Sequence, residues 1–465
     1  MKSIFNRAPL LPNTCTPLSP GAIRPEGWLG AQLRAFEAAV CADLPRLFQG
    51  EGGWERELYA FETIVALAWT LENDALKEEA ARRAEAILSS QNEEGWFGPE
   101  GDRDYWPRIL ALRALRLYFE ATADRNVHKF MDAFFKYQYR TFATHPLNDL
   151  AVARGGDNIL LALWLYNITG QSYLVELCRR LREQTLDWPN YFHTFPNAQP
   201  LSRSLRWPRL KEALYEEKAE PLEGEHRPYF HTQYQLTNGE NIAVGLRTPG
   251  AINLFKSGFK EQGGFRFGWE KLMKYHGVAY GMFTADNHLN GSSPTQGTTL
   301  TAVAEMLSTL ETLAGMGEMS REIPDIFEKI AFNALPAAYS QDMRRVQRLE
   351  QANQMLISEE ERAFYNAEPD ALLYQPPFSF EAVRALGAWP KLVNHLWYAT
   401  SDGGLWAMSY APCCVRARLM DVPVRLHVSG GYPFRDTVRL EVAVKRPVEF
   451  PLYLRMPAWA RQPMI

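Results

Sequence analysis

Residues 282–311 combine side chains that can do chemistry with a clear local pattern. A loop rich in Gly, Asn, Ser and Pro runs from about 287 to 297 and leads into a segment whose apolar residues have helical spacing. Asp286 can act as a general acid or bind loop amides, and His288 can act as an acid, a base or a metal ligand. The stretch therefore predicts a polar site at the start of a buried helix.

The same stretch resembles the catalytic segment of glycoside hydrolase family 127, the β-L-arabinofuranosidase-like proteins. It reads ADNHL from residue 285 and PTQGTTLT from residue 294. In that family an acid/base glutamate precedes two zinc ligands, a glutamate and a cysteine. The match puts Asn287 at the acid/base position, and it puts Thr299 and Thr301 at the two zinc-ligand positions. The resemblance thus implies the family's fold without its reactive residues.

Further motifs extend the resemblance over most of the chain. They include PGAIRPEGWL from residue 20, RGGDN from 154, AFNALP from 331 and WPK from 389. Relatives carry a Cys-Cys pair shortly before WPK, the first cysteine being the nucleophile, but here Phe380 and Glu381 occupy those positions. Cys413 and Cys414 come after WPK, and we expect them to be a strand pair rather than the nucleophile. The resemblance therefore implies that the zinc–cysteine mechanism is replaced or lost.

Three carboxylates are candidates for the missing chemistry. Glycosidases most often place two carboxyl groups across the scissile bond, about 5–5.5 Å apart for retention and about 6.5–9.5 Å apart for inversion. On the resemblance, Glu381 stands at the second cysteine position, Asp286 lies beside the acid/base position, and Glu240 replaces an apolar residue. We expect Asp286 as the general acid and Glu381 or Glu240 as the nucleophile or base. Each also has a structural interpretation, because aspartates bind loop amides and acids stabilise the first turn of a helix.

Sugar hydroxyls require donors and acceptors at fixed angles, which Asp, Asn and Arg supply. Asp157 begins an apolar helix after two glycines, so helix capping competes with a binding role. We expect substrate contacts from these polar and aromatic side chains: Arg154, Asp157, Asn158, Asn238, Asn287, His288, Gln296 and Trp96. Because no cysteine or glutamate stands at the family's ligand positions, we expect no metal and no other cofactor.

The composition restricts the partners. The 465 residues carry 50 Lys and Arg against 54 Asp and Glu, a net charge of −4 without a basic block, which argues against nucleic acid and anionic membranes. No apolar run is long enough for a membrane span, and prolines interrupt the N-terminus where a signal peptide would be apolar. The five cysteines are too scattered for a disulfide framework. We therefore expect a cytoplasmic protein, or an exported one if a leader was removed, that binds carbohydrate alone or as a homo-oligomer.

The elements that must position these residues are mainly helices. Apolar periodicity predicts helices at 28–48, 57–71, 75–90, 107–122, 127–139, 157–168, 171–186, 240–256, 268–280, 298–315 and 322–335. From Gly404 the pattern changes to apolar runs with β-branched and aromatic residues. We predict an (α/α)6 toroid in residues 1–400, with the long loop 187–237 over one mouth, and a partial β-sandwich in 401–465. A sheet ending at residue 465 has few strands, so it is either truncated or completed by another chain.

The leading hypothesis is a zinc-independent, arabinofuranosidase-like glycoside hydrolase that uses a carboxylate pair on a glycan fragment. A catalytically inactive, glycan-binding homologue is the first alternative, which the losses at the reacting positions favour. A polysaccharide lyase is the second alternative, because helical toroids also host β-elimination with Tyr or His as the base. The fold alone does not decide among the three.

Overall fold

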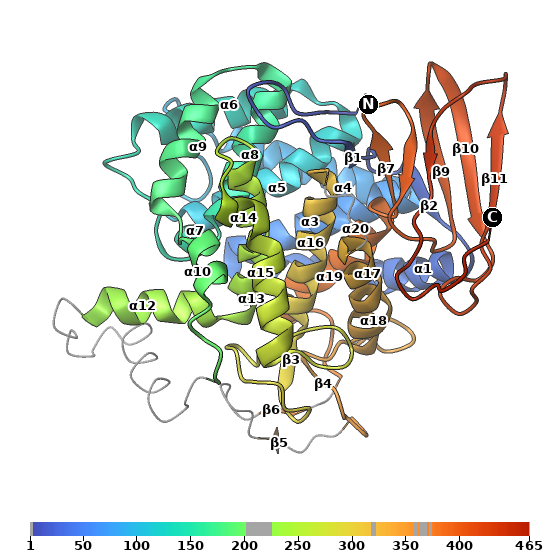
Figure 1. The fold of residues 1–465 in the computed structure, drawn as a ribbon. Coiled ribbons are helices and arrows are strands. Elements are labelled where there is room, and N and C mark those ends of the chain that lie inside the picture. Colours follow the sequence, from blue (N-terminus) through green and yellow to red (C-terminus); the bar gives the residue numbers. More distant parts are fainter. Residues whose placement is uncertain are drawn as a thin grey trace.

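The computed structural model describes residues 3–200, 226–317, 322–357, 361–362, 370–371 and 374–464. Helices form a closed ring that makes up most of the molecule, and small sheets lie against one side of the ring, at the right of Figure 1. The predicted class, a helical (α/α)6 toroid followed by a β-region, is confirmed.

The inner wall of the ring consists of helices that are buried on most sides. Each inner helix packs on the next, and α19 and α20 close the ring against α3. In α8, GGDNILLALWLYNIT, apolar side chains surround the helix instead of forming one stripe, so it is stable only between other helices. In order round the ring the inner helices are α3 (Gly53–Leu71), α5 (Tyr105–Thr122), α8 (Gly155–Thr169), α13 (Gly239–Gly245) with α14 (Thr248–Asn253), α16 (Leu300–Gly315), and α19 (Phe380–Leu386) with α20 (Ala388–Asn394).

The outer helices each cover an inner one and are amphipathic. In α6 the buried residues Val127, Phe130, Met131 and Phe134 follow the helical period, whereas the opposite face is polar. The outer helices are α4 (Asp74–Ser89) on α3, α6 (Arg125–Arg140) on α5, α9 (Tyr173–Gln184) on α8, α15 (Phe259–His276) on α14, and α17 (Glu322–Lys329) on α16. A π-helical turn, η1 (Ile330–Ala334), and α18 (Leu335–Ala337) continue α17, and α1 (Gly27–Ala42) and α2 (Leu44–Phe48) lie beside α3.

Short helices connect these elements. They are α7 (Asp149–Ala153), α10 (Trp188–Thr194) and α12 (His226–Thr237). The predicted long loop 187–237 therefore contains α10 and α12, and its residues 201–225 lie outside the described part of the chain. Two small ladders lie near the lower end of the ring in Figure 1, β3 (Gly297–Thr299) with β4 (Leu349–Gln351) and β5 (Glu361–Arg362) with β6 (Asp370–Ala371).

The β-region of the described chain holds two four-stranded sheets. One has the order β1 (Cys15–Pro17), β7 (Trp397–Thr400), β8 (Leu405–Ala407), β12 (Leu452–Tyr453), and the other has the order β11 (Arg439–Val444), β10 (Val422–Ser429), β9 (Cys413–Leu419), β2 (Ile23–Pro25). Cys413 and Cys414 begin β9, which confirms that they are a strand pair.

The first 25 residues contribute to both sheets. β1 pairs with β7, and β2 pairs with β9, so the N-terminal segment crosses from the ring to the β-region. The predicted boundary at 400/401 therefore leaves β1, β2 and β7 of these two sheets on the helical side, and β8 to β12 on the other side. In the part of the chain that the structure describes, no helix has the length and apolar character that crossing a membrane requires.

Candidate active site

The inner helices begin at one end of the ring, the lower end in Figure 1, where β3 leads into α16. We call this end the mouth. Polar side chains cap the helices there: Asp104 caps α5, Asn238 caps α13, Thr299 caps α16, and Ser379 caps α19, each accepting a backbone N–H. These caps explain why the helices start at this level, and they leave the positive ends of several helix dipoles at this one end of the ring.

Arg384 joins two of the predicted carboxylates at the mouth. Glu240 Oε1 lies 2.9 Å from an Nη atom of Arg154 and also pairs with Arg384. Arg384 Nη1 in turn lies 3.5 Å from Glu381 Oε1. Burial alone would lower the pKa of Arg384, but the neighbouring acidic groups, Glu240 first among them, together outweigh it and raise that pKa well above its usual value. The structure therefore brings Arg154, Glu240 and Glu381 into one charged cluster through a residue that the sequence analysis did not select.

Aromatic side chains support this cluster from the ring. The indole of Trp106, buried at the start of α5, lies under the Arg154 guanidinium at 4.6 Å from the ring centroid and donates to Glu55 Oε1 at 3.0 Å. The Tyr59 hydroxyl lies 3.5 Å from Arg154 Nη1, and burial raises the pKa of Tyr59. Tyr59 is therefore a neutral hydrogen-bonding group at the floor of the mouth.

The loop with the family-like motif lies directly against the start of α13. Gly239 N–H donates to the carbonyl of Asn287 at 2.9 Å, and Leu289 N–H donates to the carbonyl of Thr237 at 3.0 Å. This pairing places fully buried Asp286 next to the backbone that carries Glu240. It also explains the glycine, because a Cβ at position 239 would lie 2.2 Å from the Cβ of Ala285.

The other predicted residues of this loop, and Asn238 beside it, make contacts that hold the local backbone and side chains in place. Asn287 has a positive φ of 102°, a region that asparagine tolerates better than most residues. His288 is buried, and its Nδ1 lies 2.9 Å from Thr237 Oγ1. Half-buried Gln296 donates weakly to Thr295 Oγ1 at 3.5 Å. The side chain of Asn238 accepts from Asn241 N–H at 3.0 Å as the α13 cap. The loop thus holds its polar groups in a defined conformation at the mouth.

Three further predicted residues lie deeper in the ring or elsewhere. Asp157 lies inside the ring and does not cap α8, so the capping interpretation is wrong. Asn158 is fully buried, and among the described residues its side-chain amide has no hydrogen-bond partner. Trp96 packs edge-on against Tyr105 and donates from its indole to the carbonyl of Asp102 at 3.1 Å, in an aromatic cluster between α5 and α6.

The zinc site of the resembled family does not fit these residues. Thr299 and Thr301 offer hydroxyls that are bonded to each other at 3.3 Å, and Thr299 is used as the α16 cap. The five cysteines are all among the described residues, and they lie in β1, α1, α9 and β9, away from the mouth. Among the described residues, therefore, no thiolate lies at the mouth to complete the zinc site of that family.

A second layer of charged side chains fills the ring farther inside than the mouth. Arg247 binds Asp157 through two parallel hydrogen bonds of 2.6 and 2.7 Å and lies 3.1 Å from Glu305. Arg113 lies 3.0 Å from Glu62, 3.4 Å from Asp157 and 3.3 Å from Glu305. Burial would raise the pKa of Glu305, but the two guanidiniums outweigh it and lower that pKa strongly. The axis of the ring is thus held together by buried ion pairs.

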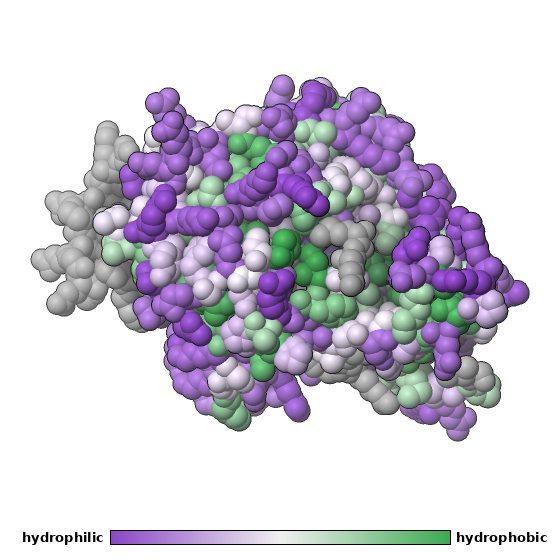
Figure 2. Space-filling model, turned by 90° about the horizontal axis from the view of Figure 1, so that it is seen from above, coloured by the Kyte–Doolittle hydropathy of each residue, from purple (hydrophilic) through white to green (hydrophobic). Residues whose placement is uncertain are grey.

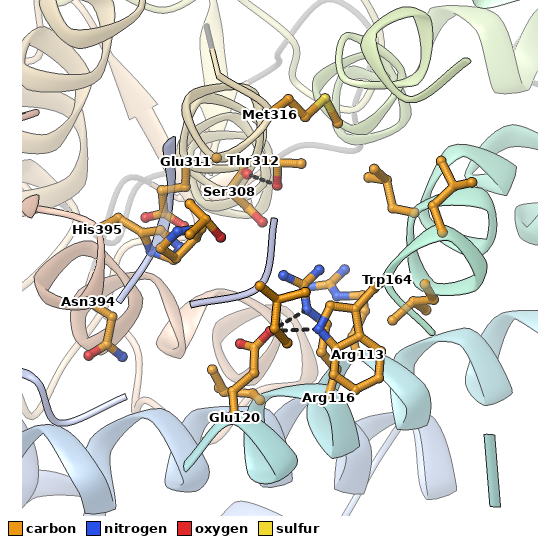
Figure 3. Close-up of a pocket in the computed structure, with 18 of the residues that line it drawn as sticks. Arg113, Arg116, Glu120, Trp164, Ser308, Glu311, Thr312, Met316, Asn394 and His395 are labelled. Atoms are coloured by element: carbon orange, nitrogen blue, oxygen red, sulfur yellow. Dashed lines mark hydrogen bonds and ion pairs between the residues drawn. The ribbon is translucent and has the colours of Figure 1, made fainter. Parts of the chain in front are cut away.

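A polar cavity of about 230 Å³ lies beyond this layer, at the opposite end of the ring from the mouth. The N-terminal residues Asn6, Asn13 and Thr16 line it together with the ends of the inner helices. Glu311 and His395 lie on one side of the cavity, and Arg116 and Trp164 lie on the other side, both bonded to Glu120 (Figure 3). The outer surface at this end is largely hydrophilic, with a hydrophobic patch near its centre (Figure 2).

Glu311 and His395 form a neutral pair at this cavity. Burial raises the pKa of Glu311 from 4.5 to about 8, and burial lowers the pKa of His395 from 6.5 to about 4. His395 Nδ1 lies 3.4 Å from Glu311 Oε2 and 2.7 Å from the carbonyl of Lys391. Between the two pKa values both side chains are uncharged, which suits a buried position.

Replacing Glu311 with glutamine should flatten the alkaline limb of the stability profile. The folded chain keeps the Glu311 proton up to about pH 8, whereas the unfolded chain releases it near 4.5, so wild-type stability falls as pH rises between these values. The difference is on the order of a few kcal/mol at alkaline pH. Thermal midpoints of both proteins across this range measure it. The acid limb, to which His395 contributes as pH falls from 6.5 towards 4, should stay in both proteins. Parallel alkaline limbs would contradict this account.

The comparisons with known proteins agree with the resemblance to glycoside hydrolase family 127. Residues 404–465 match the family model described as beta-L-arabinofuranosidase, GH127 middle domain. No curated protein matches the sequence. A solved structure described as a glycoside hydrolase has a TM-score of 0.70 at 11% identity, covering 99% of this chain and 74% of that one.

Two solved structures carry more specific names. A GH127 beta-L-arabinofuranosidase from Geobacillus stearothermophilus T6 has a TM-score of 0.62 at 16% identity, covering 92% of this chain and 70% of its own. A GH127 beta-arabinofuranosidase has a TM-score of 0.62 at 11% identity, covering 96% of this chain and 72% of its own. At these identities the likeness is one of fold.

Proposed function

We propose that this protein is a GH127-like glycoside hydrolase that cleaves a glycan without zinc or a thiolate. Its fold is similar to that of GH127 arabinofuranosidases, and residues 404–465 match the middle domain of that family. The substrate class we propose is an arabinofuranoside-like sugar, by analogy with the named structures. The observation that supports the proposal is the mouth, where Glu240 and Glu381 lie in the first turns of α13 and α19 and the loop with Asp286 packs against the start of α13.

Asp286 is the proposed general acid. A general acid must hold its proton at the working pH, and a site removed from water favours the protonated form of a carboxyl group. The side chain of Asp286 has no exposed surface and is therefore removed from bulk water. For the same reason, we infer that a bound sugar displaces part of the surrounding loop to reach it.

Glu381 is the proposed nucleophile or base, and Glu240 is a positioning residue. Glu381 is 39% exposed in the first turn of α19, so its carboxylate can meet a substrate. Glu240 Oε1 is already engaged by both Arg154 and Arg384, so its role is to hold these two guanidiniums. Arg384 in turn lies beside Glu381 and orients it.

Replacing Glu381 with glutamine should lower the turnover number by about 10²-fold or more, because the carboxylate is lost while shape is kept. The measurement is sugar release from a panel of aryl furanosides and pyranosides that includes a β-L-arabinofuranoside. Glu270→Gln, an exposed change on α15, serves as the matched control. Unchanged turnover in Glu381→Gln would remove Glu381 from the mechanism.

The same panel of sugars distinguishes hydrolysis from the two competing functions. Binding of a sugar by calorimetry without any release of reducing sugar would mark the protein as a glycan-binding relative. The structural reason for a loss of catalysis would be that Glu240 is paired with Arg154 and Arg384, so its charge is already neutralised at the centre of the mouth. An unsaturated product, detected by its ultraviolet absorbance, would instead mark a lyase.

A further inference from the structure

A thiol and an imidazole face each other on the outer side of the sheet β11-β10-β9-β2. Cys414 on β9 and His427 on β10 are directly opposite in the strand register. Along β10 the residues Val424, Leu426 and Val428 are buried, so His427 points to the other side, where it is 42% exposed. Cys414, which alternates with buried Cys413 and Val415, lies on this same side of the sheet. His427 Nε2 lies 3.8 Å from Cys414 Sγ.

A carboxylate from a distant part of the sequence joins this pair. Glu26 precedes α1, and its backbone N–H donates to the carbonyl of Pro412 at 2.9 Å, which fixes it next to the start of β9. Although Glu26 is at the cap position of α1, its side chain does not cap the helix. Instead its Oε2 lies 3.4 Å from His427 Nδ1, across 401 positions of sequence. The Glu26 carboxylate therefore does not cap α1 and contacts the His427 imidazole instead.

The three side chains have the spacing of metal ligands. One ligand atom from each of Glu26, Cys414 and His427 lies within 4.8 Å of the other two, and within the described ranges no other group of such residues does so. Tetrahedral zinc with Zn–S of about 2.3 Å and Zn–N of about 2.0–2.1 Å separates sulfur and nitrogen by about 3.5 Å. Cys414 Sγ lies 3.8 Å from His427 Nε2 and Glu26 Oε2 lies 3.4 Å from Nδ1, so one ion reaches all three residues only after the Glu26 side chain rotates to the Nε2 edge of the ring. Thiolate, imidazole and carboxylate together are a ligand set typical of zinc.

We propose that Glu26, Cys414 and His427 bind a zinc ion, with Cys414 Sγ, one imidazole nitrogen and one carboxylate oxygen as ligands. Because Glu26 and His427 are 41% and 42% exposed, the fourth position is open to water. Arg24, which is opposite Cys414 in the register, pairs with Glu72, and Arg416 on the same face lies 4.0 Å from that carboxylate. The site is separate from the mouth and does not depend on the proposed hydrolysis.

Bound zinc would connect the N-terminal segment to the C-terminal sheet. Between β2 and the start of α1 the chain leaves the sheet for the helical ring, and Glu26 lies at this point. A metal bridge from Glu26 to β9 and β10 stabilises the folded state, because the ligands are assembled only on folding.

The test is titration of the purified, reduced, metal-free full-length chain with Co²⁺, whose complex with a thiolate has a charge-transfer absorption. We expect one equivalent to produce this band together with the visible bands of tetrahedral cobalt, and Zn²⁺ to displace it. Cys414→Ser should lose the charge-transfer band completely. His427→Ala and Glu26→Gln should weaken Co²⁺ binding by about 10-fold or more.

The matched control is Cys41→Ser, which removes an exposed cysteine on α1 and should keep the band. His427 and Glu26 are partly exposed, so their variants should fold, and the thermal midpoint without metal checks this directly. Zn²⁺ should raise the midpoint of the wild type and of Cys41→Ser, but not of Cys414→Ser. A charge-transfer band that persists in Cys414→Ser, unchanged affinity in His427→Ala, or no band in the wild type would each overturn the proposal.

Discussion

Replacing Asp286 with asparagine should reduce the turnover number by about 10²- to 10⁴-fold, the range that a general acid contributes. Asparagine has nearly the same shape as aspartate, so the loop packed against Thr237 and Gly239 should keep its backbone contacts. The change removes the proton that the leaving group needs, while sugar binding stays. The measurement is single-turnover and steady-state hydrolysis of the substrate found in the aryl glycoside panel, with binding measured by calorimetry.

The control for this variant is Asp74→Asn, a change at an exposed aspartate in the first turn of α4, which should retain full activity. A leaving-group series adds a sharper criterion. Asp286→Asn should lose least activity with the most acidic aryl leaving groups, because these depart without protonation. Equal losses for all leaving groups would indicate a structural effect, and wild-type turnover would exclude Asp286 as the acid.

Replacing Arg247 with methionine should destabilise the fold by about 3–5 kcal/mol, the cost of removing one partner from a buried ion pair. Arg247 is almost fully buried, and its loss leaves Asp157 with one guanidinium contact of 3.4 Å and leaves Glu305 with one of 3.3 Å. The two carboxylates would then face each other with a single cation, Arg113, between them. Thermal unfolding followed by circular dichroism at a fixed heating rate measures the change.

The matched control is Arg266→Met on α15, where an exposed arginine pairs with Glu270 four residues later. This change should leave the unfolding midpoint unchanged, because exposed pairs add little stability. A second substitution tests the cause. Asp157→Asn combined with Arg247→Met should recover part of the loss, since it removes one of the unbalanced charges. Equal midpoints for Arg247→Met and the wild type would contradict the importance of the buried network.

The long helices were predictable from sequence because their apolar period is sustained. The helix predicted at 107–122 is α5, Tyr105–Thr122, and the one predicted at 298–315 is α16, Leu300–Gly315. The start of α15 was predicted nine residues late because glycines interrupt its pattern. These glycines serve packing: a Cβ at Gly268 would lie 2.6 Å from the ring of Phe192. β1 and β2, with three residues each, are too short for any period to register.

The site could be predicted in part. The motif around Asp286 and the helix starts at Arg154, Glu240 and Glu381 indicated residues that do lie at one mouth. Arg384, which connects two of them, carries no local signal, because a pairing across 144 positions is set by the closure of the ring. Glu305 did carry a signal, a charge inside a mostly apolar helix, that points to a buried ion pair, whereas Arg113 is one of three arginines in α5 and does not stand out.

Trp96 illustrates the opposite problem. An indole next to glycines in a loop resembles a sugar-stacking residue in sequence, yet it packs at 5.2 Å from Tyr105 and lies 4.4 Å from the Arg108 guanidinium. Aromatic side chains serve cores and sugars equally well, so sequence does not separate the two uses.

Hydrolysis by metal-depleted protein tests the central claim most directly. Cys414→Ser, which lacks the proposed zinc site but keeps the mouth, is treated with a chelator and assayed on an aryl β-L-arabinofuranoside and the rest of the panel. A carboxylate mechanism predicts a rate equal to that of the untreated protein, and a rate lost when Asp286→Asn is added. A rate abolished by the chelator and restored by zinc, or no hydrolysis of any sugar in the panel, would contradict it.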